Sequence, residues 1–369
     1  MRILLIRLRL IGDVVFTTPA IRAVRRRFPD GHLAYVVEPE SAPVVAHNPH
    51  LDEVIVVARP KAEGRLASDV ALARRLRRAR YDVVIDFHGG PRASLLTLAT
   101  GAPMRIGYTV KGRSWVYTHR IARSRELRPR HSVLNQWDLL EPLGIGPADR
   151  ATDATEMVED AQASARVGQR LGASGYREGD DLVVLHVSAG NPFRRWPVES
   201  YAALAARLAS RAPSRWVALT SGPSDITAAG RASDEARRLA ELISPGAGAR
   251  IVQAGEFDLY DLRALIDCAV LFIGGDSGPM HIAGTTRTPI VGLYGPTLPA
   301  RSEPWRDRSL VAEVVERLDL ACRPCDQRTC VTRDFRCLTA LGVDAVHTAA
   351  ERALERRART ANPESSTRN

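Results

Sequence analysis

Lysine is nearly missing from this sequence, and its scarcity affects how the charge is interpreted. Of the 52 basic residues, two are lysine, Lys61 and Lys111, and the remaining 50 are arginine. This skew indicates the base composition of the genome rather than a nucleic-acid site, because neither zinc-finger spacing nor an RNA-binding aromatic motif accompanies it. We therefore expect no nucleic-acid partner. The net charge of +10 still favours an anionic partner, and peripheral contact with acidic lipid head groups fits the same charge.

Long apolar runs are also missing. No stretch approaches the roughly 20 residues that span a bilayer, and the start, MRILLIRLRLIGDVV, is too interrupted by arginine for a signal peptide. We therefore expect a cytoplasmic protein that can contact the cytoplasmic face of the inner membrane peripherally. The 369 residues, 45% of them hydrophobic, fit a soluble chain with two domains of ordinary size.

Several standard catalytic motifs are absent. GxGxxG does not follow the first strand, which argues against a nicotinamide cofactor, and neither GxxxxGK[ST] nor HExxH occurs. GDSGP at 275–279 misses the GxSxG pattern of a hydrolase, because Pro279 takes the last glycine position. There is no Asp-x-Asp pair, which argues against a metal-clamped pyrophosphate. We therefore expect no required cofactor and no catalytic metal.

Cysteine is scarce but clustered. Four of the five cysteines follow the pattern Cys322-x2-Cys325-x4-Cys330-x6-Cys337. In a cytoplasmic protein such a cluster favours metal binding or redox chemistry over disulfides. Four thiolates can hold a structural zinc, although these spacings match no standard zinc module. The fifth, Cys268, lies in an apolar helical pattern and is expected in the core.

What the sequence does contain is an alternation of short apolar strands and helices, repeated in two halves. This alternation predicts an α/β protein with doubly wound parallel sheets covered on both faces. The predicted strands cover 2–6, 32–37, 54–57 and 82–86 in the first half, and 182–187, 216–221, 250–254, 270–273 and 289–293 in the second. The predicted helices cover 14–28, 66–79 and 131–144, then 198–211, a stretch after 225, and 258–268.

The two halves predict two domains. We place an N-terminal domain over 1–160 and a C-terminal domain over 161–338, with the connection in the Gly-, Pro- and acid-containing stretch 145–180. A last helix over 339–360 is expected to pack back toward the N-terminal domain. The tail 361–369 has little to bury and is expected to be disordered.

The stretch 271–294 carries the clearest site signal. An apolar strand leads into a glycine-rich turn and then a helix, and unpaired backbone N–H groups at such a turn make a seat for phosphate. His281 follows Ser277 by one helical turn and lies on the same face. The alternative is that Asp276 or Ser277 only caps the helix and that His281 lies on its surface.

Two other places carry candidate chemistry. Asp13 follows Gly12 on the loop after the first strand, which suits a general base, and its alternative is an N-cap for a helix starting at Val14. Arg194 and Arg195 follow a strand end, and a guanidinium grips phosphate oxygens in pairs. The alternative for them is a solvated surface pair.

These features together resemble the heptosyltransferase family, inverting glycosyltransferases that use ADP-heptose to build the inner core of lipopolysaccharide. The resemblance implies a GT-B fold, in which two Rossmann-like domains face a cleft, the N-terminal one binding the acceptor and the C-terminal one the nucleotide sugar. The segments that carry it are ILLIRLRLIGDVVFTTPAIRAVRRRFP (3–29), RRWPVESYAAL (194–204), GGDSGPMHIAGTTRTPIVGLYGPT (274–297) and the cysteine pattern from Cys322.

The resemblance also implies roles for single residues. Asp13 matches the family's proposed catalytic base, and Gly12 belongs to the acceptor loop. Arg194 stands where the family commonly has lysine, and either it or Arg195 contacts the diphosphate. The other donor-binding matches are Ser188 and Ala189 in a donor loop, Asp225 at the ribose, Phe257 at the adenine, Asp276 at the sugar hydroxyls, Ser277 and Gly278 in the phosphate-binding turn, and His281 at the diphosphate.

We therefore predict a metal-independent inverting glycosyltransferase. It would move heptose from ADP-heptose to a hydroxyl of a lipopolysaccharide core or a related glycan, with a lipid-linked or anionic acceptor, and would act as a monomer. The alternative is a GT-B-type sugar-nucleotide epimerase or hydrolase, which would release nucleotide without any acceptor.

Overall fold

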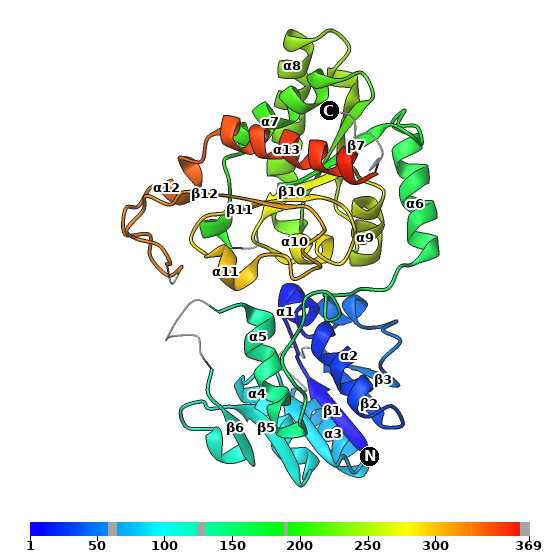
Figure 1. The fold of residues 1–369 in the computed structure, drawn as a ribbon, viewed down its shortest axis with the longest axis vertical. Helices are drawn as coiled ribbons and strands as arrows, with labels where there is room; N and C mark the ends of the chain where they lie inside the picture. Colours follow the sequence, from blue (N-terminus) through cyan, green and yellow to red (C-terminus); the bar gives the residue numbers. More distant parts are fainter. Residues whose placement is uncertain (58–64, 124–129, 188–190, 326, 362–369) are drawn as a thin grey trace, which may run out of the picture. The chain divides into compact units, whose positions relative to one another are not determined.

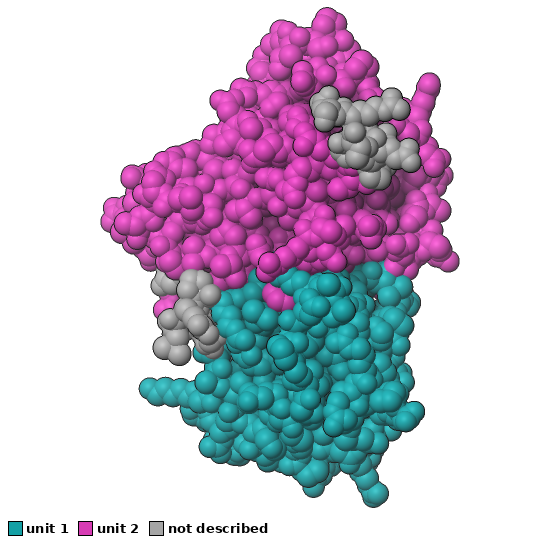
Figure 2. Space-filling model, in the orientation of Figure 1, with its two compact units in different colours: residues 1–158 teal, residues 159–369 magenta. Residues whose placement is uncertain are grey.

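The computed structural model describes residues 1–57, 65–123, 130–187, 191–325 and 327–361. The chain forms two compact units, Met1–Val158 and Glu159–Asn369, shown in separate colours in Figure 2. The boundary between them lies inside the connecting stretch 145–180. Each unit has its own six-stranded parallel sheet, so each is described by itself.

In the first unit, apolar runs such as RILLI and HLAYVV form strands whose inward residues are fully buried. Its strands are β1 (Arg2–Ile6), β2 (His32–Val37), β3 (Glu53–Val56), β4 (Val83–Asp86), β5 (Met104–Tyr108) and β6 (His119–Ile121). Its helices are α1 (Ile11–Val15), α2 (Thr18–Arg27), α3 (Arg65–Arg78), α4 (Pro91–Thr100) and α5 (Ser132–Trp137), with the 3-10 segments η1 (Pro39–Val44), η2 (Ser114–Val116) and η3 (Asp138–Leu143).

The second unit repeats the scheme (Figure 1). Its strands are β7 (Asp181–His186), β8 (Arg215–Thr220), β9 (Ile251–Gly255), β10 (Leu271–Gly275), β11 (Ile290–Tyr294) and β12 (Ala312–Glu316). Its helices are α6 (Ala161–Gly172), α7 (Val198–Arg211), α8 (Ile226–Ile243), α9 (Leu259–Asp267), α10 (Gly278–Ala283), α11 (Pro299–Ser302), α12 (Arg336–Thr339) and α13 (Val343–Ala361), with η4 (Pro192–Arg194), η5 (Pro223–Asp225) and η6 (Gly248–Arg250).

The strand order is the same in both sheets. It runs β3-β2-β1-β4-β5-β6 in the first unit and β12-β11-β10-β7-β8-β9 in the second, and every described strand pair is parallel. The predicted class, α/β with two doubly wound sheets, is therefore confirmed. In such sheets ligands bind where the strand order reverses, beyond the carboxyl ends of the two central strands. Those pairs are β1 with β4 and β7 with β10.

The helix predicted over 14–28 is in fact two helices. It breaks between α1 and α2 because Pro19 has no N–H to continue the ladder. Two threonine hydroxyls bond to carbonyls at the break: Thr17 Oγ1 donates to Val14 O at 2.7 Å, and Thr18 Oγ1 donates to Val15 O at 2.8 Å. The apolar periodicity of 14–28 continues across this break, so the periodicity alone predicted a single helix.

Two other predictions need correction. The connecting stretch contains helix α6, which Asp160 caps by accepting bonds from the N–H groups of Gln162 and Ala163 at 2.8 and 3.1 Å. Cys268, predicted in the core, is exposed just after α9.

The last helix also differs from its prediction. α13 packs against α7 and strands β10 to β12 of its own unit, and Figure 1 shows it beside α7. Val346, Ala349 and Ala353 bury its apolar face in the core of the second unit, and Arg352 and Arg356 pair with Glu313 of β12. This small-residue face fits closely against a sheet, so the helix completes the second unit. The residues from 362 onward lie outside the described part, and no helix in the described part is long and apolar enough to cross a membrane.

Candidate active site

The turn after β10 brings three predicted residues together. Asp276 follows the strand directly and is 3% exposed, and the Nε2 atom of His281, one turn into α10, lies 3.4 Å from its Oδ1 atom. His281 is buried, so it is not a helix-surface residue. Ser277 holds the N-cap position, but its hydroxyl donates back to the Gly275 carbonyl at 3.1 Å and does not cap α10. The capping alternative is therefore wrong.

Arg194 completes this group from the loop after β7. Its Nη1 atom lies 3.2 Å from Asp276 Oδ2 and donates to the Asp276 carbonyl at 3.0 Å. Gly275 allows the approach, because a Cβ atom there would stand 3.2 Å from the Arg194 carbonyl oxygen. Burial works to raise the pKa of Asp276, but His281 and Arg194 outweigh it and hold the pKa below its ordinary value. The carboxylate is therefore ionised and fixed in place.

Arg195 turns to the neighbouring strand end instead. Its Nη2 atom lies 3.1 Å from Oδ1 of Asp225, a buried carboxylate after β8 whose Oδ2 accepts from Ser224 at 2.7 Å. The two arginines thus divide the two predicted donor carboxylates between them. The sequence alone did not predict this ion pair between Arg195 and Asp225.

Phe257 lies beyond the end of β9. Arg170 of α6 stacks on its ring, with the guanidinium carbon 4.2 Å from the ring centroid. Asp258 caps α9 through the N–H groups of Tyr260 and Asp261 at 2.9 and 2.8 Å, which fixes the turn that carries Phe257. The other predicted donor residues, Ser188 and Ala189, lie outside the described residues.

In the first unit, Asp13 lies inside α1, so it neither sits on a loop nor caps a helix starting at Val14. Its carboxylate pairs with Arg7, whose side chain is buried and donates to the Phe87 carbonyl at 2.7 Å. The Asp13 side chain remains 30% exposed. An exposed carboxylate at the reversal of strand order is placed to meet a substrate hydroxyl. Gly12 beside it is buried in the same short helix.

A second carboxylate of this unit was missed by sequence reasoning. Asp86, fully buried at the end of β4, accepts from the Tyr117 hydroxyl at 2.6 Å and from the N–H groups of His88 and Gly89 at 2.8 Å each. Burial raises its pKa despite these bonds. The available signal was an acidic residue followed by FHGG after an apolar strand. The network braces the turn that follows β4.

The cysteine segment, defined as residues 322–337 without 326, contains four free, partly exposed thiols. No group of three or more histidine, cysteine or acidic side chains in the described part of the chain is arranged to hold a metal. The four sulfurs therefore do not form a zinc site in this conformation, and zinc at the cluster is not supported.

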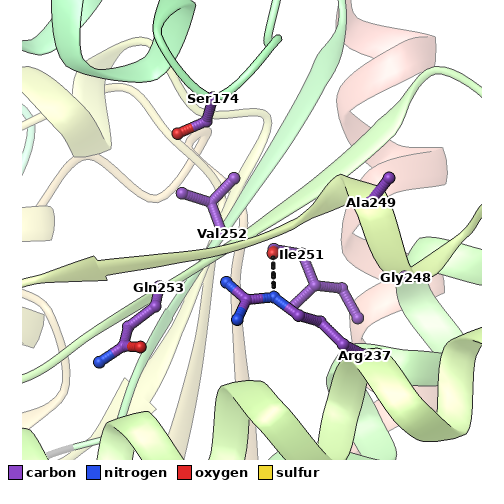
Figure 3. A pocket seen from close by; sticks show the side chains of 7 residues that line it. All are labelled: Ser174, Arg237, Gly248, Ala249, Ile251, Val252 and Gln253. Carbon is purple, nitrogen blue, oxygen red and sulfur yellow. Dashed lines mark hydrogen bonds between the residues drawn. The ribbon is translucent and has the colours of Figure 1, made fainter.

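A cavity of about 390 Å³ lies elsewhere, beside the amino-terminal half of the edge strand β9 (Figure 3). There Arg237 donates its Nε–H to the Ile251 carbonyl at 3.0 Å. The carbonyl of an edge strand is thereby covered, which protects it from pairing with another chain. The cavity is lined by Ser174, Arg237, Gly248, Ala249, Ile251, Val252 and Gln253.

Comparison with known proteins points to one family. The profile of "Glycosyltransferase family 9 (heptosyltransferase)" matches residues 70–335. Lipopolysaccharide heptosyltransferase 3 of Escherichia coli K12 is 30% identical over 300 residues, which cover 80% of this chain and 83% of that protein.

Solved structures share the architecture. The glycosyl transferase family 9 protein of Veillonella parvula aligns with a TM-score of 0.82 at 24% identity, covering 96% of this chain and 97% of that one. ADP-heptose lipopolysaccharide heptosyltransferase II of E. coli aligns with a TM-score of 0.77 at 19% identity, covering 97% and 100%. The expected GT-B class is confirmed by these likenesses.

Proposed function

The chain belongs to glycosyltransferase family 9, the heptosyltransferases, and we propose that it transfers heptose from ADP-heptose to a hydroxyl of a lipopolysaccharide core or related glycan. The observation that carries this proposal is the group formed by Arg194, Asp276 and His281 at the strand-order reversal of the second unit. ADP-heptose as donor is supported by the name of the E. coli structural relative.

The donor half of the proposal assigns each group by its charge. Arg194, His281 and the N–H groups of Ser277 and Gly278 bind the diphosphate, because these are the cationic or donor groups at the turn. Asp276, ionised and fixed, accepts bonds from the sugar hydroxyls. Asp225 meets the ribose, and the free face of Phe257 takes the adenine, since Arg170 covers its other face. Ser188 and Ala189 complete the donor loop.

The acceptor half of the proposal rests on Asp13 and Gly12, both in helix α1. Asp13 takes the proton of the acceptor hydroxyl, whose oxygen forms a bond to the anomeric carbon with inversion. The bond from that carbon to the phosphate oxygen breaks, and ADP leaves with the electron pair. Arg194 and His281 meet the charge that grows on the leaving phosphate. We propose that no metal takes part, because the Arg194 guanidinium and the hydrogen-bond donors of the turn stabilise the leaving phosphate instead.

Three properties belong to the same proposal. The acceptor is lipid-linked or anionic, which the net charge of +10 favours, and the enzyme works at the cytoplasmic face of the inner membrane as a monomer. The four cysteines are not needed for transfer. Full activity after dialysis against a chelator, with zinc and iron absent by elemental analysis, is the expected result.

The proposed reaction is tested by following ADP release from ADP-heptose with and without a heptose-accepting core oligosaccharide. We expect release only when the acceptor is present, together with a product heavier by one heptose in mass spectrometry. Equal release without acceptor would show a hydrolase or epimerase and contradict the proposal. UDP- and GDP-sugars serve as matched donor controls.

A further inference from the structure

The cysteine segment reaches the donor site through one side chain. Oε1 of Gln327 accepts from Arg194 Nε at 2.7 Å and from Asn191 Nδ2 at 2.9 Å. We propose that Gln327 is a positioning residue that holds the Arg194 guanidinium ready for the donor diphosphate. This inference rests on the proposed function, since it takes Arg194 to be the diphosphate-binding cation.

The Arg194 guanidinium is held through two of its three nitrogens. Nη1 is held by Asp276 and Nε by Gln327, whereas Nη2 makes no hydrogen bond to a described residue. Two anchored nitrogens fix the plane of the group and leave Nη2 as the donor for a phosphate oxygen. An arginine side chain that is free to move loses rotamer entropy when it binds a ligand. An arginine that is already anchored has lost that entropy before the ligand binds.

The chemistry of the anchor suits the task. The amide oxygen of Gln327 is neutral, so it accepts the Nε–H without adding to the negative charge that Asp276 already places beside Arg194. A second carboxylate at this position would pair with Arg194 as well and compete further with the diphosphate. Glutamine thus fixes the position of the guanidinium without adding negative charge.

The segment itself is fixed firmly enough to serve as an anchor. The Gln327 N–H donates to Cys325 Sγ at 3.2 Å, and the Cys325 N–H donates to the Pro296 carbonyl at 3.1 Å, just beyond β11. Gln327 has a φ of 60°, a left-handed conformation that a non-glycine residue keeps only when its surroundings hold it. Arg323 binds the same turn through the Thr297 carbonyl at 2.9 Å.

The loop that carries Arg194 packs against this segment along its length. Phe193 makes an edge-on contact with Phe335, with ring centroids 5.1 Å apart, and its N–H donates to Asn191 Oδ1 at 3.0 Å. Asn191 also accepts the Arg194 N–H at 2.9 Å through its carbonyl. Gln327 therefore holds both the guanidinium and, through Asn191, the turn that presents it.

The test is a double-mutant cycle read by ADP calorimetry and steady-state kinetics on the full chain. We expect Gln327→Ala to weaken ADP binding and raise the donor KM about tenfold, the range of one hydrogen bond to a charged group, and to leave the acceptor KM unchanged. In an Arg194→Ala background the same change should have no further effect. Thr329→Ala, an exposed change in the same segment, is the matched control and should bind ADP as wild type.

The outcomes separate this inference from the proposed function. Wild-type ADP binding by Gln327→Ala, or a full tenfold loss on top of Arg194→Ala, would overturn the positioning role and leave the proposed function standing. Wild-type ADP binding by Arg194→Ala would instead overturn the donor assignment itself. Gln327→Met keeps the length of the side chain without the oxygen, so it serves if the alanine variant melts at a lower temperature than wild type.

Discussion

Asp86 and Asp276 stand at the end of the corresponding strand in two units of the same topology, β4 and β10. Both carboxylates are almost fully buried, yet their partners differ in kind. Asp86 is bonded to a tyrosine hydroxyl and two backbone N–H groups, and its pKa is raised by burial. Asp276 faces an arginine and a histidine, and its pKa is lowered.

From this difference we propose that the carboxylate braces a turn in the first unit and binds the donor in the second. Neutral donors satisfy Asp86 completely, so it holds a turn and has little left for a ligand. His281 and Arg194 hold the pKa of Asp276 below its ordinary value, so its carboxylate stays ionised. In the first unit we propose Asp13, which follows β1, as the proton acceptor; it pairs with Arg7 but stays 30% exposed.

The largest effect is expected from Asp13→Asn. The amide cannot take the acceptor proton, so kcat should fall about a thousandfold, the scale of a general base. The unfolding free energy should fall by about 1–3 kcal/mol, because the buried Arg7 guanidinium loses its counter-charge but can still donate to the Asn oxygen. Steady-state kinetics and urea denaturation measure the two quantities. A variant with wild-type kcat would end the assignment of Asp13 as base.

The same substitution at the two buried carboxylates sharpens the comparison. Asp276→Asn should lower the unfolding free energy by about 3 kcal/mol, since it removes the charge of a buried, ion-paired carboxylate. It should also weaken ADP-heptose binding about tenfold, because the sugar hydroxyls lose a charged acceptor. Asp86→Asn keeps a carbonyl oxygen for the backbone N–H groups and should bind ADP-heptose as wild type. Calorimetry without acceptor and urea denaturation of both variants check this. Equal ADP-heptose affinities of the two variants would contradict the assignment of Asp276 to the donor.

A pH effect is expected from His186, which is buried at the end of β7 and bonded through Nδ1 to Thr220 Oγ1 at 2.9 Å. Burial lowers its pKa from 6.5 to about 4. As the pH falls, the His186 imidazole is therefore protonated near pH 6.5 in the unfolded chain but only near pH 4 in the folded chain. The stability is retained above pH 6.5 and lost as the pH falls to 4, by up to about 3 kcal/mol.

Removing this histidine should flatten that dependence. In His186→Asn the slope of unfolding free energy against pH between 4 and 6.5 should fall by about 1.4 kcal/mol per pH unit, one proton's worth. His88, whose pKa is also lowered to about 4, should keep a second proton's slope in place. An unchanged slope in urea denaturation across this range would show that His186 titrates normally.

The smallest effect tests the brace itself. Tyr117→Phe removes the hydroxyl that donates to Asp86 at 2.6 Å and contacts Ser94 Oγ at 2.8 Å. The unfolding free energy should fall by about 1–2 kcal/mol, because a buried acceptor loses its partner. ADP binding should not change. A loss of ADP affinity would mean that the first unit's brace affects the donor site.

Much of the fold was predictable from the sequence. Runs such as LVVLHV and HLAYVV mark buried parallel strands, and their alternation with helices predicted the doubly wound sheets. Local sequence patterns failed to predict the structure where contacts with other residues determine it. Pro19 broke a helix whose apolar periodicity continued. Asp160 with Ala163, Val167 and Leu171 formed α6 in a stretch that was predicted as a connection.

The site was predicted in part for the same reason. The glycine-rich turn after β10 identified Asp276 and His281 because their spacing is local. The bond between Arg194 and Gln327 joins residues 133 positions apart, and no local pattern carries it. The different carboxylate partners of Arg194 and Arg195 likewise could not be predicted from the sequence.

The most direct test is a side-by-side titration of the wild type, Asp13→Asn and Asp276→Asn with ADP-heptose, followed by calorimetry without acceptor. We assign the donor to the second unit and the proton acceptor to the first. We therefore expect wild-type affinity for Asp13→Asn and about tenfold weaker binding by Asp276→Asn, because the sugar hydroxyls lose a charged acceptor. Equal loss of ADP-heptose binding in both variants, or wild-type binding by Asp276→Asn, would contradict this assignment.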